Sequence, residues 1–163
     1  MATTVLEMDK RNEAGENLKL EMKRVIRASR QRVFDAWTRP ETIRLWFGPG
    51  RELGEVLADA KVGGDYSFTM LTKEGAANGV DVIQTSSAKG RYVRVEPYDL
   101  LQFTWIGSWD PSVESIVTLT LTDVEGGTEL VFVQQRFSSE ASRDQHAFGW
   151  TPALDKLKQV LEA

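Results

Sequence analysis

The chain has 163 residues, of which 41% are hydrophobic and 27% charged, as expected for one globular domain. The formal net charge of −4 argues against a nucleic-acid partner, and no apolar run is long enough to span a bilayer. The sequence has no Cys and only one His, which excludes disulfides, cysteine nucleophiles and the common zinc and iron motifs. We therefore expect a cytoplasmic protein with no metal, no cofactor and no membrane insertion.

The N-terminal part, residues 1–17, is polar and aperiodic, which predicts a flexible arm ahead of a single domain over residues 18–163. Side chains then alternate between residues 18 and 26, which predicts a half-buried strand. Arg24 falls on the inward face of that strand. It either pairs with a carboxylate of a neighbouring strand or lines an internal cavity, where it could meet an anionic ligand group.

Two short helices are predicted after this strand. Ser29 is a suitable N-cap for the first, and Pro40 favours the start of the second, whose apolar side includes Trp46. The Gly-Pro-Gly sequence at residues 48–50 should end it.

Alternating segments separated by turn residues follow, and they predict one curved antiparallel sheet. The segments are residues 52–59, 65–71, 80–87, 91–97, 100–106, 115–123 and 128–136.

A final helix is predicted from about Ser139 to Leu161, with an apolar stripe that includes Trp150 and places His146 near its middle. Pro152 should kink this helix or delay its regular start, and Phe148 falls on the polar side.

Six motifs occur in order along the chain and resemble those of one family. They are RVFDAWTRPETIRLWFGPG (Arg32–Gly50), DAKVGGDYSFTM (Asp59–Met70), LLQFTW (Leu100–Trp105), ESIVTLTL (Glu114–Leu121), GGTEL (Gly126–Leu130) and RDQHAFGWTPALDKL (Arg143–Leu157). Together they are similar to the activator-of-heat-shock-protein-90-ATPase homologue-like family of the START-like, or SRPBCC, superfamily. One departure is Gln134, which stands where many relatives carry a second His.

The resemblance implies an α+β helix-grip fold. In that fold a curved antiparallel sheet of about six or seven strands wraps around a long C-terminal helix and leaves a cavity between them, and two short helices follow the first strand. Relatives include cavity-containing proteins of unknown ligand, co-chaperones with a second domain, and a few cyclases.

The leading interpretation is a small, non-catalytic protein that holds a hydrophobic small molecule in that cavity, at a volume of roughly 300–1,000 Å³. The expected ligand-binding residues are Arg24, Trp46, Tyr66, Phe68, Met70, Trp105, Gln134, His146 and Trp150. Within this set we expect His146 to pair with Gln134, the nearest partner that strand periodicity offers. We expect His146 to be the polar fixture of the pocket rather than a purely structural group.

Two other interpretations stay open. A co-chaperone-like regulator of a heat shock protein 90-type ATPase would need an exposed patch, for which Trp109 is the candidate anchor unless it folds back over the cavity mouth. A cyclase- or hydratase-like enzyme acting on a polyketide-like ligand would use His146 for proton transfer. A homodimer through the exposed sheet surface is also left open.

Overall fold

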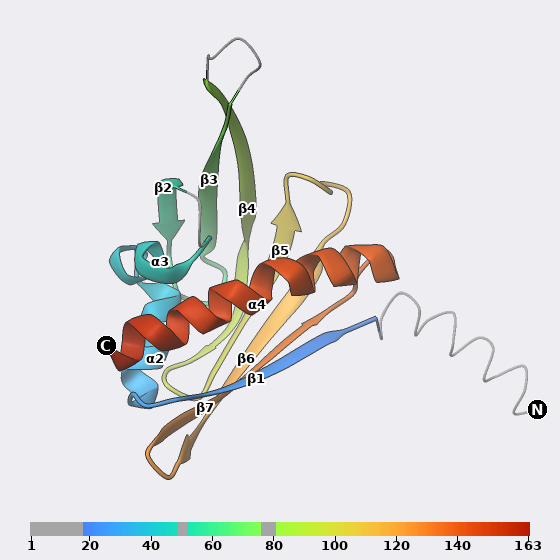
Figure 1. Ribbon diagram of the computed structural model, residues 1–163. Helices are drawn as coiled ribbons and strands as arrows, with labels where there is room; N and C mark the ends of the chain where they lie inside the picture. Colours follow the sequence, from blue (N-terminus) through green and yellow to red (C-terminus); the bar gives the residue numbers. More distant parts are fainter. Residues whose placement is uncertain (1–17, 49–51, 76–80) are drawn as a thin grey trace, which may run out of the picture.

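The computed structural model describes residues 18–48, 52–75 and 81–163 (Figure 1). The predicted arm, residues 1–17, and nearly all of the predicted loop at residues 75–79 lie outside the described residues. Within them, seven antiparallel strands form one sheet in the order β1-β7-β6-β5-β4-β3-β2. The strands are β1 (Leu20–Ile26), β2 (Glu52–Ala58), β3 (Asp65–Gly75), β4 (Asp81–Glu96), β5 (Leu100–Gly107), β6 (Ser115–Val124) and β7 (Gly127–Gln135).

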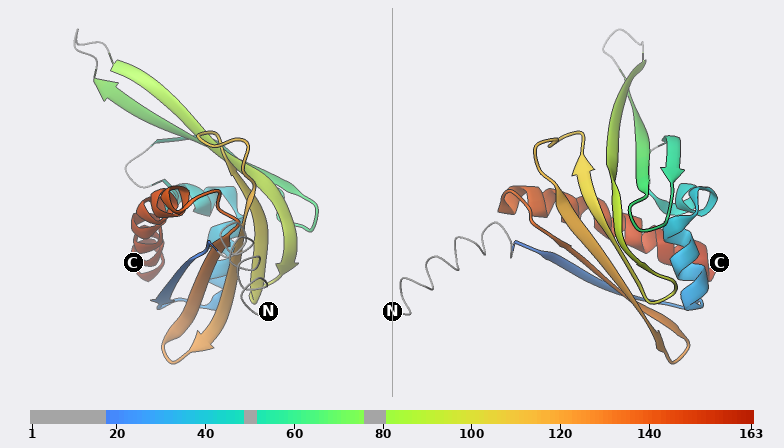
Figure 2. Two further views of the ribbon diagram at one scale, coloured as in Figure 1. Left: turned by 90° about the vertical axis from the view of Figure 1, so that its right-hand side faces the viewer. Right: turned by 180° about the vertical axis from the view of Figure 1, so that it is seen from behind.

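Three helices pack on the inner face of this sheet: α2 (Arg30–Thr38), α3 (Pro40–Trp46) and α4 (Glu140–Glu162). The sheet curves around α4, while α2 and α3 close one end of the space between them (Figures 1 and 2). The hairpin of β3 and β4 extends beyond the body of the domain (Figure 2). The α+β helix-grip architecture predicted from the sequence is therefore confirmed.

Local sequence explains where the helices begin. The Ser29 hydroxyl accepts a hydrogen bond from the Arg32 backbone N–H at 3.2 Å, and the Ser139 hydroxyl accepts one from the Ser142 N–H at 3.0 Å. Pro40 occupies the first turn of α3, where its missing N–H costs nothing.

α4 is continuous through Pro152 and begins at Glu140, so the delayed start that Pro152 predicted does not occur. Phe148 is 86% exposed, as its place on the polar side of α4 predicted. No helix among the described residues has both the length and the apolar character needed to cross a membrane.

Charged side chains join α4 to the edge strand β1. Arg24 Nε donates to the Asp155 carboxylate at 3.0 Å, and Lys158 Nζ donates to the Val25 carbonyl at 2.6 Å. Arg24 therefore has a carboxylate partner, but on the helix rather than on a neighbouring strand, because β1 turns its inner face toward α4. The Arg24 side chain is 22% exposed and lies at the edge of the sheet, away from the cavity wall.

Gly90 does not separate two strands, as its position between two alternating segments suggested. β4 runs without interruption from Asp81 to Glu96, and Gly90 pairs directly with Tyr66 of β3. A Cβ at this position would overlap the Thr104 carbonyl oxygen and come within 2.7 Å of the Tyr66 hydroxyl. The glycine therefore provides space for a close approach between strands, and this space lets the Tyr66 hydroxyl donate to the Thr104 carbonyl.

Candidate functional site

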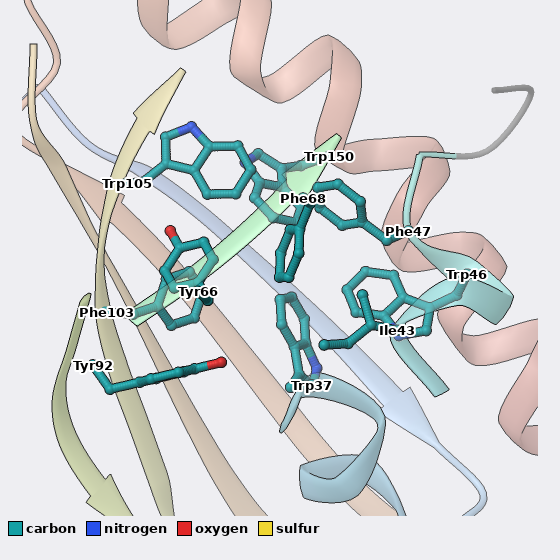
Figure 3. Close-up of a pocket in the computed structure, with 10 residues that line it drawn as sticks. All are labelled: Trp37, Ile43, Trp46, Phe47, Tyr66, Phe68, Tyr92, Phe103, Trp105 and Trp150. Carbon is teal, nitrogen blue, oxygen red and sulfur yellow. The ribbon is translucent and has the colours of Figure 1, made fainter. Parts of the chain in front are cut away.

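Ten side chains enclose a small space between the sheet, the two short helices and α4 (Figure 3). We call them the aromatic cluster, because all but Ile43 are aromatic. Its members are Trp37, Ile43, Trp46, Phe47, Tyr66, Phe68, Tyr92, Phe103, Trp105 and Trp150. All ten are buried. None of them carries a charged group, so the space offers an uncharged, apolar environment.

The space inside the aromatic cluster has a volume of about 10 Å³, close to the minimum for one water molecule. The expectation of a preformed cavity of ligand size is therefore wrong. The rings pack against one another, with centroid separations of 4.5 Å for Trp37 and Trp46 and 4.9 Å for Phe47 and Phe68. Each of these aromatic contacts is stabilising, and together they fill the volume that the curved sheet would otherwise leave open.

Five of the nine predicted ligand-binding residues belong to the aromatic cluster: Trp46, Tyr66, Phe68, Trp105 and Trp150. Arg24, Met70, Gln134 and His146 do not line the space. Sequence reasoning missed the other five members, Trp37, Ile43, Phe47, Tyr92 and Phe103. The apolar faces of the predicted helices contained Trp37, Ile43 and Phe47, and the inward alternation of β5 contained Phe103, so periodicity could have found these four.

Four of the six hydrogen-bonding side chains in the aromatic cluster have partners inside the protein. Trp46 Nε1 donates to the Ala36 carbonyl at 2.8 Å, and the Tyr66 hydroxyl donates to the Thr104 carbonyl. Trp105 Nε1 donates to His146 Nε2 at 3.2 Å. Trp150 Nε1 donates to the Gln134 side-chain carbonyl at 2.9 Å.

The remaining two groups are Trp37 Nε1 and the Tyr92 hydroxyl. Trp37 is 6% exposed, and its Nε1 is buried without a hydrogen-bond partner among the described residues. Tyr92 is 2% exposed, and its hydroxyl makes none of the hydrogen bonds found in the described part of the chain. Figure 3 shows both side chains at the same end of the aromatic cluster, with the Tyr92 hydroxyl pointing toward Trp37. Of the two, the buried Trp37 N–H is the unusual group, because a buried donor without an acceptor costs about 1–3 kcal/mol.

Burial keeps both phenols of the aromatic cluster in their neutral form. It raises the pKa of Tyr92, with a smaller contribution from the Asp59 carboxylate. It also raises the pKa of Tyr66 well above the ordinary value, and Tyr92 and Glu114 add to the effect. The two hydroxyls can therefore donate hydrogen bonds throughout the physiological pH range.

Gln134 and His146 do not form the pair that strand periodicity suggested. The fully buried Gln134 accepts from Trp150 through its oxygen, and its nitrogen donates to the Ser115 hydroxyl at 2.9 Å. The side-chain oxygen and nitrogen of Gln134 therefore both have hydrogen-bond partners, and the residue lies behind the aromatic cluster. Gln134 holds the Trp150 ring in place, and the cluster separates it from the interior space.

His146 is satisfied by other partners. Its Nε2 accepts from Trp105, so the proton lies on Nδ1, which donates to the Ser142 carbonyl at 2.7 Å. Burial lowers the pKa of His146, against weaker opposing effects of the Ser142 hydrogen bond and the Asp110 carboxylate. The ring lies behind Trp105 instead of on the cavity wall, so in this conformation it is not the polar fixture of the pocket that we expected.

The family model described as "Activator of Hsp90 ATPase homolog 1-like protein" matches residues 27–162. The chain belongs to this family. A protein from Chromobacterium violaceum is 26% identical and has a TM-score of 0.75, covering 89% of this chain and 98% of its own. A protein from Rhodobacter sphaeroides is also 26% identical, with a TM-score of 0.70 and coverage of 88% and 91%.

The AHSA1 protein from Silicibacter pomeroyi shares the fold at 22% identity, with a TM-score of 0.68 and coverage of 88% of this chain and 96% of its own. No curated protein matches the chain.

In this member of the family, Trp109 folds back onto the domain. A Cβ at Gly107 would come within 2.8 Å of the Trp109 ring, and the ring centroids of Trp109 and His146 are 5.8 Å apart. Trp109 remains 46% exposed. It therefore covers the His146 side of the domain rather than standing free as an anchor for a partner.

A larger hollow, with a volume of about 680 Å³, lies on the opposite face of the sheet. We call it the outer groove. Its β4 residues Lys89 and Arg91 alternate with Ala88 and Tyr92, which point inward, and Leu57 and Ile106 add apolar surface. Tyr66 is the one predicted site residue that contributes to its lining. Among the described residues, no three acidic or histidine side chains gather to hold a metal ion.

Proposed function

We propose that this protein binds an apolar small molecule within the aromatic cluster, and that the ligand enters by displacing side chains that now fill the space. The observation that carries the proposal is the buried Trp37 N–H, which has no acceptor among the described residues and belongs to a side chain that lines the space in the cluster. A bound molecule would supply that acceptor. A pocket of this kind, which opens only when its ligand binds, is a cryptic pocket.

The wall that we expect to move is α3. Its hydrogen bonds among the described residues run within the helix or to α2, as in the contact of Trp46 Nε1 with the Ala36 carbonyl. Among the described residues, Ile43 and Trp46 of α3, and Phe47 directly after it, contact the rest of the aromatic cluster through side-chain packing. A displacement of this seven-residue helix therefore breaks no sheet hydrogen bond, whereas every other wall is part of the sheet, α2 or α4.

Binding can be measured with N-phenyl-1-naphthylamine, a neutral fluorescent probe. We expect a dissociation constant in the micromolar range for the unmodified protein. Ile43→Ala removes part of the wall and should tighten binding about tenfold, or about 1.4 kcal/mol. The physical reason is that the variant already contains some of the volume that the probe must otherwise clear, at a cost to stability of about 2–5 kcal/mol.

Leu121→Ala is the matched control, because Leu121 is also buried but lies on β6 outside the aromatic cluster. It should lower the stability without changing the affinity for the probe. Absence of binding up to the solubility limit of the probe contradicts the proposal. So does an equal gain in affinity for the two variants, which would indicate binding to a loosened core in general.

A further inference from the structure

The polar groups of the aromatic cluster indicate which kind of ligand it can bind. Of its six N–H and O–H groups, four have hydrogen-bond partners among the described residues. Trp37 Nε1 is buried without such a partner, and the Tyr92 hydroxyl, which makes none of the hydrogen bonds of the described residues, lies toward the same end (Figure 3). Trp37 Nε1 can only donate a hydrogen bond, and the Tyr92 hydroxyl can donate one as well. Both groups therefore suit an acceptor atom on the ligand.

The residues that line the space also indicate the charge of the ligand. Among the described residues, no Lys, Arg or His lines the space, and the imidazole of His146 has both nitrogens engaged, by Trp105 and by Ser142. A buried carboxylate without a cation is strongly disfavoured, because its desolvation is not compensated. An uncharged oxygen, such as a carbonyl, meets the two donors without this cost.

The shape of the ligand follows from the rings. Trp46, Phe68 and Trp150 present ring faces and edges at several inclinations, and an aromatic pair gains about 0.5–1.5 kcal/mol beyond the burial of its area. We infer that the ligand class is an uncharged, planar aromatic molecule with a carbonyl oxygen that accepts hydrogen bonds from Trp37 Nε1 and the Tyr92 hydroxyl. This inference rests on the proposed function, because it concerns the same pocket.

Three compounds with one ring system separate these requirements: indane, 1-indanone and indane-1-carboxylate. They differ in having no acceptor, a neutral acceptor and an anionic acceptor. Displacement of N-phenyl-1-naphthylamine should show 1-indanone binding about tenfold more tightly than indane, as expected for one or two added hydrogen bonds. Indane-1-carboxylate should bind more weakly than indane at pH 7.

A direct readout comes from the ¹H–¹⁵N spectrum, in which the five Trp residues give five indole signals. The signal lost in Trp37→Phe identifies Trp37. In the unmodified protein, 1-indanone should move this signal downfield, while indane should not. Tyr92→Phe should reduce the preference for 1-indanone over indane. Tyr98→Phe is the control, because Tyr98 is partly exposed and lies outside the aromatic cluster.

The outcomes separate this inference from the proposed function. Equal affinity for indane and 1-indanone, or a Trp37 signal that 1-indanone leaves in place, overturns the inference and leaves apolar binding intact. Tight binding of indane-1-carboxylate also overturns it. If neither indane nor 1-indanone displaces the probe, the proposed function is wrong and the inference fails with it. If Trp37→Phe does not fold, Tyr92→Phe and the spectrum of the unmodified protein still decide the result.

Discussion

His146 is held as a neutral imidazole by two hydrogen bonds that fix its tautomer. Nδ1–H donates to the Ser142 carbonyl, and Nε2 accepts from Trp105. A second proton on Nε2 would face the Trp105 N–H, so the charged form loses this contact. His146 therefore acts on the aromatic cluster through Trp105, whose ring it orients from behind.

The stability of the fold should decrease as His146 becomes protonated. Burial places its folded-state pKa below the ordinary value of 6.5, so below about pH 6.5 the unfolded chain binds more protons than the folded one. The stability that neutral His146 contributes is present above this pH, and it is progressively lost as the pH falls toward the folded-state pKa.

Urea unfolding at several pH values between 8 and 5 can measure this effect, with His146→Gln as the reference. Gln keeps a donor and an acceptor but does not titrate. Below pH 6.5 the unfolding free energy of the unmodified protein should fall relative to that of His146→Gln. A difference that is independent of pH would show that His146 does not titrate differently in the folded state.

Among the described glycines, Gly90 is the one at which an added Cβ would come closest to another atom, at 1.9 Å from the Thr104 carbonyl oxygen. Gly90→Ala should lower the free energy of unfolding by about 1–3 kcal/mol, because its Cβ overlaps the Thr104 carbonyl and displaces the Tyr66 hydroxyl. Thermal or urea unfolding measures this loss directly.

Gly149→Ala is the matched control for the same substitution. A Cβ at Gly149 meets no atom within 4 Å, and the residue lies inside α4. Alanine is the better helix former, so this variant should gain about 0.5–1 kcal/mol. If Gly90→Ala were as stable as the unmodified protein, the close approach of β4 and β5 would not be a feature of the folded protein.

The regular elements could be predicted from the sequence because each depends on a local pattern. Alternation found the strands, and Ser29, Pro40 and Ser139 marked the helix starts. Gly90 was misinterpreted as a break between strands, because the reason for a glycine there is the approach of Tyr66 and Thr104 from two other strands. That reason is tertiary, and a single sequence does not contain it.

The candidate site was predictable only in part, for a similar reason. Periodicity correctly placed Trp46, Tyr66, Phe68, Trp105 and Trp150 on inward faces. It could not show which ring reaches which partner, so His146 was assigned to Gln134 instead of Trp105. It also could not show the remaining volume, which depends on how rings from strands and helices far apart in the sequence pack together.

At the scale of the whole molecule, the fold offers two places for a ligand on opposite faces of one sheet. The aromatic cluster is uncharged, closed and short of hydrogen-bond acceptors, whereas the outer groove is open and carries charged residues such as Lys89 and Arg91. Their chemistry differs enough to distinguish them. The proposed function assigns the neutral, apolar ligand to the cluster, with α3 as the wall that moves.

A crystal structure of the protein grown with 1-indanone would show directly whether the ligand lies in the aromatic cluster. We predict the compound within the aromatic cluster, against Trp46, Phe68 and Trp150, with its carbonyl at the Trp37 and Tyr92 end and with α3 displaced outward. The compound bound in the outer groove beside Lys89 and Ile106, or an aromatic cluster still closed around its present 10 Å³, would contradict the account.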